Sequence, residues 1–174
     1  MKIKKVFTLA LVSMLLFTAC SKNSDSGHGS TTDTDKLKAA TTATYPVGTK
    51  VILKTDHMDG MSDAKGTVSG VYDTTVYAVD YTDADTGKEV KNHKWVIQEE
   101  LKDSEGKTYT VGDEVSLNTG HMSGMGGEGQ KATITEVVNG PVYMVDYTPT
   151  TGGSLVKNHQ WVIESELEED QSNN

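Results

Sequence analysis

The fold is decided by the stretch KNHKWVI at residues 91–97, which returns almost unchanged as KNHQWVI at residues 157–163. Further segments repeat in the same order ahead of each of these two stretches. They are YPVGTKV at 45–51 with YTVGDEV at 109–115, HMDGM at 57–61 with HMSGM at 121–125, and VDY at 79–81 with VDY at 145–147. The chain is therefore built from two copies of one small module.

Each copy contains short runs of β-branched and aromatic residues that are separated by turn-forming residues, a pattern typical of small strands. In the first copy these runs are residues 49–54, 66–72, 75–81 and 89–97. Within residues 75–81 large apolar side chains alternate with smaller or polar ones, as in a half-buried antiparallel strand. Only the closing stretches, 96–101 and 162–167, favour a helical turn. The sequence predicts an all-β protein.

Small modules of this kind, opening with Val-Gly-x-x-Val and closing with Trp-Val-Ile-x-x-x-Leu, indicate two tandem small SH3-like or Tudor-like barrels. Closure into barrels would remove exposed strand edges. The predicted modules span residues 45–101 and 109–167, with an acidic and polar tail at 168–174. The predicted linker at 102–108 is short enough for the two barrels to pack together.

The first residues have the three-part layout of an export signal. Lys2, Lys4 and Lys5 precede an apolar run at residues 6–17, which is too short to span a bilayer comfortably. Cys20, the only cysteine, follows small residues, so we expect a lipoprotein signal at 1–20 and a lipid anchor on Cys20. The alternative is an ordinary cleaved signal with an incidental cysteine.

The composition after the signal also limits location and function. Residues 21–44 are too polar to bury a core, so we expect a disordered tether that holds the modules at the outer face of the cell membrane. The formal charge is minus nine and arginine is absent, which argues against nucleic acid and phosphate ligands. Catalytic signatures such as Gly-x-Ser-x-Gly are missing, so we expect no enzyme activity.

The two His-Met-x-Gly-Met loops carry the main candidate site. Thioether sulfur suits Cu(I), imidazole suits copper and zinc alike, and a zinc site would normally use thiolates. The loops therefore predict a Cu(I) site, and we expect the protein to fold without the metal. The expected ligands are His57, Met58, Met61, His121, Met122 and Met125. The alternative is that one methionine fills a gap under the barrel and the histidine caps the loop.

The KNHxWVI segments carry a second set of candidates. Strand alternation places His93, Trp95 and Ile97 on one face, and the second copy repeats the arrangement with His159 and Trp161. The histidines are candidate additional metal ligands, and the tryptophans are candidate caps that hold a cation against a π face. The alternative is a core tryptophan with a hydrogen-bonded histidine beside it.

The paired loops, the VDY strands and the KNHxWVI segments behind a lipobox-like leader together resemble the YdhK-like family. That family comprises Gram-positive lipoproteins with a duplicated domain of unknown function, some of them linked to copper resistance. The resemblance covers about residues 45–167 and implies a Cu(I)-binding role through the loop histidines and methionines. The expected partners are the metal ion, the membrane through the anchor alone, and a copper-handling protein or the cell wall, with the protein a monomer. A non-enzymatic adhesion module that binds cell wall or protein is the alternative function, and a structural spacer is a third.

Overall fold

The computed structural model describes residues 32–118, 124–125 and 129–173. The predicted signal and Cys20 lie outside these residues. The strands are β1 (Lys50–Leu53), β2 (Lys65–Thr82), β3 (Glu89–Ile97), β4 (Glu114–Leu117), β5 (Gln130–Tyr147), β6 (Val156–Ile163) and β7 (Leu167–Glu169). The 3-10 turns are η1 (Thr34–Lys36), η2 (Gln98–Glu100), η3 (Glu164–Glu166) and η4 (Gln171–Asn173). In this part of the chain, no helix has the length and apolarity needed to cross a membrane.

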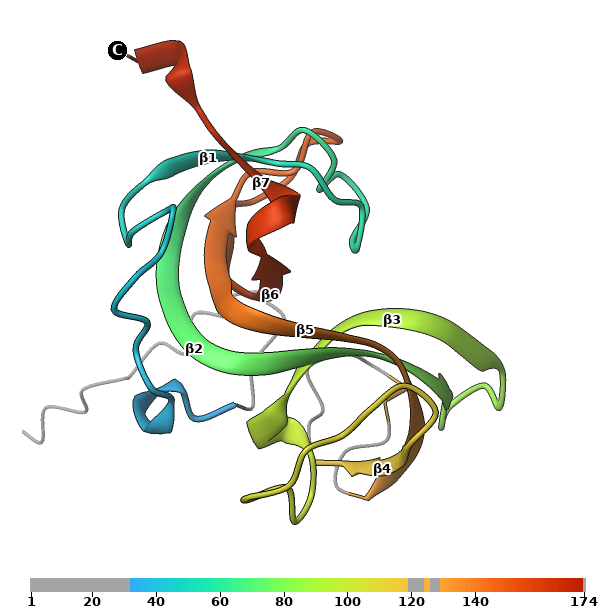
Figure 1. The fold of residues 1–174 in the computed structure, drawn as a ribbon. Helices are drawn as coiled ribbons and strands as arrows, with labels where there is room; N and C mark the ends of the chain where they lie inside the picture. The colour runs from blue at the N-terminus through green and yellow to red at the C-terminus, as the bar shows by residue number, and fades with distance from the viewer. Residues whose placement is uncertain (1–31, 119–123, 126–128, 174) are drawn as a thin grey trace, which may run out of the picture.

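Two long strands, β2 and β5, form the spine of the molecule (Figure 1). They pair antiparallel along their 18-residue lengths, from Gly66 opposite Tyr147 to Tyr81 opposite Ala132. Gly66 and Ala132 are equivalent positions of the two copies, and so are Tyr81 and Tyr147. The pairing is thus related to itself by an internal two-fold axis, as in a symmetric dimer in which both subunits use the same surface.

The remaining strands build a lobe at each end of this spine, within one seven-stranded sheet. The first lobe combines β1 and the start of β2 from the first copy with the end of β5, β6 and β7 from the second. The second lobe combines the end of β2 and β3 with β4 and the start of β5. Each lobe therefore combines strands from both copies.

Three clusters of buried side chains follow this division. The first-lobe core joins Leu53 and Met61 of the first copy to Tyr143 and Val162 of the second. The second-lobe core joins residues such as Tyr77 to Leu117 and Met125. A central cluster between the lobes holds both tryptophans, Trp95 and Trp161, which are completely buried.

The all-β class and the tandem duplication agree with the prediction from sequence, and the predicted closing turns are η2 and η3. Two predicted segments, 66–72 and 75–81, form the single strand β2. The expectation of barrels closed within one copy differs from what is observed, because β2 runs through both lobes and pairs with β5 over its whole length. The two copies exchange halves instead of standing side by side.

Both ends of the described chain are more ordered than predicted. In the stretch expected to be tether, the amide of Ala40 donates to the Val71 carbonyl at 3.1 Å, and Leu37 packs against the central cluster. At the other end, the expected tail contributes β7, which pairs with β1 so that Glu169 lies opposite Val51. Apolar residues in the first segment and a free strand edge at β1 explain both additions.

Candidate metal site

The first His-Met loop lies between β1 and β2 and is joined to the second copy through a buried hydrogen bond. The side chain of His57 is 8% exposed, and its Nε2 lies 2.8 Å from Oε1 of Glu166 on η3. Glu166 is itself only 8% exposed. A buried imidazole and a buried carboxylate from different copies thus meet at the first-lobe core.

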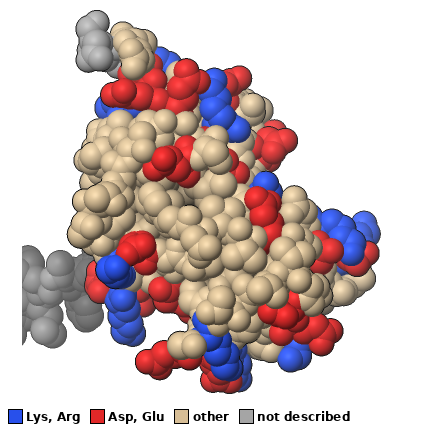
Figure 2. Space-filling view, viewed as in Figure 1, with Lys and Arg blue, Asp and Glu red and all other residues tan. Residues whose placement is uncertain are grey.

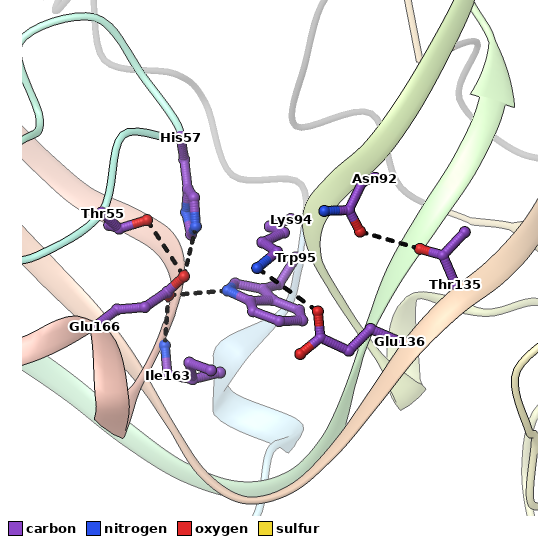
Figure 3. A network of polar contacts seen from close by, with 9 residues as sticks. All are labelled: Thr55, His57, Asn92, Lys94, Trp95, Thr135, Glu136, Ile163 and Glu166. Atoms are coloured by element: carbon purple, nitrogen blue, oxygen red, sulfur yellow. Dashed lines mark hydrogen bonds and ion pairs between the residues drawn. The ribbon is translucent and has the colours of Figure 1, made fainter.

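The Glu166 carboxylate is the centre of a hydrogen-bond network (Figure 3). Its Oε2 accepts from the indole Nε1 of Trp95 at 2.9 Å and from the backbone amide of Ile163 at 3.0 Å. The hydroxyl of Thr55 donates to Oε1 at 3.2 Å. Burial by itself would raise the pKa of Glu166, but the hydrogen bonds that His57, the amide of Ile163 and Trp95 donate outweigh it, so the pKa is lowered.

This network decides which nitrogen of His57 carries the proton. An ionised carboxylate can only accept hydrogen bonds, so Nε2 of His57 must be the donor to Glu166. The other nitrogen, Nδ1, is buried and has no hydrogen-bond partner among the described residues. When the imidazole is neutral, its lone pair therefore lies on the buried Nδ1, while a carboxylate holds the ring from the opposite side. Metal-binding histidines typically show this arrangement of carboxylate, imidazole and free nitrogen.

The two methionines of the loop differ in environment. Met61 is completely buried in the first-lobe core, and Met58 is partly buried against the same core. The packing of Met61 matches the gap-filling alternative, and Met125 is completely buried in the second-lobe core in the same way. Within the described residues, no three His, Cys, Asp or Glu side chains are gathered where they could hold a metal, so a site here depends on sulfur.

Two features of the loop require glycine at position 60: its backbone conformation and its close contact with the second copy. Gly60 has φ of +75°, and a Cβ there would come within 2.5 Å of Thr151 Oγ1, in the β5–β6 connection of the other copy. The amide of Thr150 donates to the Gly60 carbonyl at 2.8 Å. The loop is thus held against the second copy. A Cβ at Gly124 would likewise clash with the carboxylate of Asp83 in the first copy.

The second loop is described only in part, since His121 and Met122 fall outside the described residues. Its equivalent carboxylate is Glu100 on η2, which is 2% exposed. Glu100 accepts from Nε1 of Trp161 at 3.2 Å and from the amide of Ile97 at 2.9 Å, as Glu166 does from their counterparts. The hydroxyl of Thr32, in the segment ahead of both copies, also donates to Glu100.

The histidine of each KNHxWVI segment lies in a different lobe from its own loop. The ring of His93 lies 5.7 Å from Tyr81, whose side chain is in the second-lobe core, while His159 makes the same contact with Tyr147 in the first-lobe core. His159 therefore shares a lobe with His57, and His93 does not. Alternation failed to predict this because the β2–β3 register shifts at Val79, as at a β-bulge, so that His93 and Trp95 lie on different faces.

Trp95, the expected cap, lies near the loop but its ring and its indole nitrogen already contact other side chains. The ring of Trp95 lies 6.3 Å from that of His57, with an edge-to-face orientation. The Lys94 ammonium group sits 4.7 Å from the Trp95 ring centre, and the indole nitrogen binds Glu166. Trp161 instead packs edge-to-face on Tyr72 at 5.8 Å.

Sequence reasoning missed the two carboxylates, although a signal was present. The motif Ile-x-x-Glu-Leu closes both copies, at Ile97 and at Ile163, and places an acidic residue among buried apolar ones. Two other carboxylates, Asp80 and Asp146 of the VDY strands, each accept a hydrogen bond at 2.7 Å, from the amides of Asn92 and Asn158 respectively. These carboxylates close the hairpins and do not contribute to the metal site.

Comparison with known proteins agrees with this duplicated fold. The family model described as a protein of unknown function (DUF1541) matches residues 47–98 and 111–164. The uncharacterized protein YdhK of Bacillus subtilis strain 168 is 50% identical over 139 residues, which cover 80% of this chain and 67% of that protein. A crystal structure of a DUF1541 family protein (ydhK) from this organism is 49% identical, with a TM-score of 0.74, and covers 78% of this chain and 91% of that one. A solution structure of the ydhK C-terminal domain is 52% identical, with a TM-score of 0.66, and covers 71% of this chain and 92% of that one.

Proposed function

The chain belongs to the family described as a protein of unknown function (DUF1541), and from its first His-Met loop we propose that it binds Cu(I). The ligands in this lobe are His57, Met58 and Met61. The observation that carries the proposal is the buried Nδ1 of His57. In the described part of the chain it has no hydrogen-bond partner, although Glu166 binds the other ring nitrogen.

The chemistry of the donor set favours a soft ion. One imidazole nitrogen and two thioethers match the preference of Cu(I), and neither sulfur can be oxidised to a disulfide outside the cell. Met58 is the more accessible of the two sulfur ligands, whereas Met61 is completely buried. Entry of an ion therefore involves movement of the loop. Because an ion held in this way can be passed on, sequestration or transfer of copper is the proposed role.

The surface charge supports attraction of a cation. Figure 2 shows acidic side chains near the C-terminus and around the opposite lobe, with fewer charges in the area between. The whole chain carries a formal charge of minus nine. Such a field raises the local concentration of cations but does not select copper. Selectivity for copper has to come from sulfur and imidazole.

A competition titration tests the proposal. The purified protein is titrated anaerobically with Cu(I) in the presence of a colorimetric chelator, and the expected result is removal of copper from the chelator by wild-type protein. Replacement of His57 by Ala should lower the amount of copper retained. A wild-type protein that takes no copper from the chelator would contradict the proposal.

Methionine replacements separate sulfur from packing. Met58→Leu and Met61→Leu keep volume and remove sulfur, so each should cost less than about 1.5 kcal/mol of stability while weakening Cu(I) binding. Met144→Leu is the matched control, because Met144 is 8% exposed and packs in the central cluster away from the loop. Equal copper affinity in all three variants would place the ligands elsewhere.

Export and anchoring are part of the proposed function. We propose that Cys20 carries the lipid that holds the protein at the outer face of the cell membrane. A Cys20→Ala variant should be released into the medium or remain unprocessed, and mass spectrometry of the mature N-terminus should show the lipid on wild type. A wild-type N-terminus without lipid would contradict the anchor.

One observation favours a second function, binding of a cell-wall or protein ligand. A pocket of about 800 Å³ lies beside Tyr77 and Tyr109, and the exposed Val111 forms part of its wall. Pockets of this size suit small ligands. A pull-down on purified cell wall, with and without a copper chelator, tests it, and a Val111→Asp variant should bind less if this pocket is used.

A further inference from the structure

We infer that Glu166, contributed by the second copy, is the positioning residue of the first metal site, since it holds His57 in the Nε2–H tautomer and makes Nδ1 the ligand atom. This inference rests on the proposed Cu(I) function for its metal-binding part. Its structural part, the tautomer of His57, stands on the geometry alone. Imidazole spectra measure the tautomer, and chelator competition measures the Cu(I) affinity.

The Glu166 carboxylate is held in one orientation. Two donors, Trp95 Nε1 and the amide of Ile163, bind Oε2 at 2.9 Å and 3.0 Å. They fix the side chain so that Oε1 faces the His57 ring at 2.8 Å. A group fixed in this way selects the tautomer of a neighbouring imidazole, because it can only accept a proton donor.

A glutamine amide in place of the Glu166 carboxylate would present a different hydrogen-bonding group to His57. In a Glu166→Gln variant, the two donors at Trp95 and Ile163 select the amide oxygen, because the amide NH₂ cannot accept from them. The NH₂ group then faces His57 and must donate to Nε2. The proton of the imidazole moves to Nδ1, which removes the free lone pair. A change of one atom in the side chain thus reverses the tautomer without changing its shape.

Neither copy supplies all the residues of the site by itself. The first copy supplies His57, both loop methionines and Trp95, and the second copy supplies Glu166 and the amide of Ile163. The loop is also held from the second copy through Thr150. The exchange of halves between the copies is therefore what completes the metal site.

The experiment measures tautomer and affinity in the full protein. Long-range ¹H–¹⁵N spectra of the imidazole nitrogens report the tautomer without metal, and chelator competition reports the Cu(I) affinity. Wild type should show the Nε2–H form of His57. Glu166→Gln should show the Nδ1–H form and bind Cu(I) about 10- to 100-fold more weakly, the usual cost of losing such a carboxylate.

The matched control is Glu100→Gln. It makes the same change at the equivalent carboxylate and loses equivalent bonds to Trp161 and Ile97, but Glu100 makes no described contact with His57. It should leave the His57 signals unchanged. A change of the His57 tautomer in Glu100→Gln equal to that in Glu166→Gln would show a general structural effect and overturn the inference.

The remaining outcomes are equally decisive. An Nδ1–H tautomer in wild type overturns the positioning role even if the variant fails to fold. A reversed tautomer with unchanged copper affinity overturns the role of Nδ1 as ligand. Absence of Cu(I) binding in wild type, with the expected tautomer and its reversal, removes the proposed function and leaves the positioning of His57 by Glu166 supported.

Discussion

Glu166 and Glu100 occupy equivalent places in the two copies, but the described residues around them differ. Each carboxylate accepts from a buried tryptophan indole and from a backbone amide three residues earlier in the chain. Beyond that, Glu166 meets His57 and Thr55, whereas Glu100 meets Thr32, which precedes both copies. Each carboxylate thus fixes a tryptophan, and Glu166 also holds the histidine of the first loop; the counterparts of Thr55 and His57 in the second loop, residues 119 and 121, lie outside the described residues.

The largest effect comes from removing the tryptophans that both carboxylates bind. Trp95→Ala and Trp161→Ala should each lower the free energy of unfolding by about 3–5 kcal/mol, because each empties a completely buried site. Only Trp95→Ala should also weaken Cu(I) binding in the first lobe, since it releases Glu166. Urea unfolding followed by circular dichroism measures the first effect. A loss below about 1 kcal/mol in either variant would show that the central cluster is not shared as described.

Glycine replacements sharpen the comparison at the loops. Gly60→Ala meets Thr151 Oγ1 at 2.5 Å and also adopts positive φ, whereas Gly48→Ala has φ of +92° and nothing within 4 Å. Gly48→Ala should cost about 1–2 kcal/mol from its backbone alone, and Gly60→Ala should cost roughly 1–3 kcal/mol more from the clash. Thermal or urea unfolding measures the difference. Equal losses would mean that the loop does not press on the second copy.

The paired aspartates give a pH test. Hydrogen bonding from the Asn92 amide, followed by Lys91, lowers the pKa of Asp80 from its usual 3.8. Because the folded pKa lies below the unfolded one, Asp80 stabilises the protein above about pH 4, and this stability is lost as pH falls through the folded pKa. Asp80→Asn should cost about 1–2 kcal/mol at pH 7, and the gap from wild type should shrink below pH 4. A gap that grows on acidification would contradict the assignment.

The smallest effects are expected at Thr55 and Thr32, whose hydroxyls donate to Glu166 and Glu100 respectively. Thr55→Val and Thr32→Val each remove one hydroxyl donor, so each should cost about 0.5–1.5 kcal/mol. Thr55→Val should also shift the signals of His57, which shares Oε1 of Glu166 with it, and Thr32→Val should not. Urea unfolding and imidazole spectra measure these changes. A His57 shift in Thr32→Val would show that the two networks communicate through the central cluster.

Local features of the fold were predictable because they depend on neighbouring residues. The alternation of Tyr77, Val79 and Tyr81 indicates a half-buried strand, and the Val-Ile ending of each repeat leads into a short turn. The bulge opposite Val79 was not predictable, because a single extra residue in a strand leaves the hydrophobic pattern almost unchanged. That residue decides that His93 and Trp95 lie on different faces.

The sequence indicated the loop residues of the candidate site but not the carboxylate that holds the histidine. Two copies of the loop indicate His57, Met58 and Met61, yet Glu166 lies more than one hundred residues away in sequence. A glutamate in an Ile-x-x-Glu-Leu ending signals a buried carboxylate, and both copies show it. No feature of a single copy indicates that its carboxylate will bind the loop of the other.

The sequence by itself determined the duplication, the all-β class, the strand segments and the soft-donor loops, because each follows from short-range patterns of polarity, turn residues and side-chain chemistry. Only the tertiary structure decided which copy completes which lobe. Two copies with the same apolar faces present the same partners to each other as to themselves, so hydrophobic pattern cannot choose between pairing within a copy and pairing between copies. The continuous pairing of β2 with β5 makes that choice, and it brings Glu166 to His57.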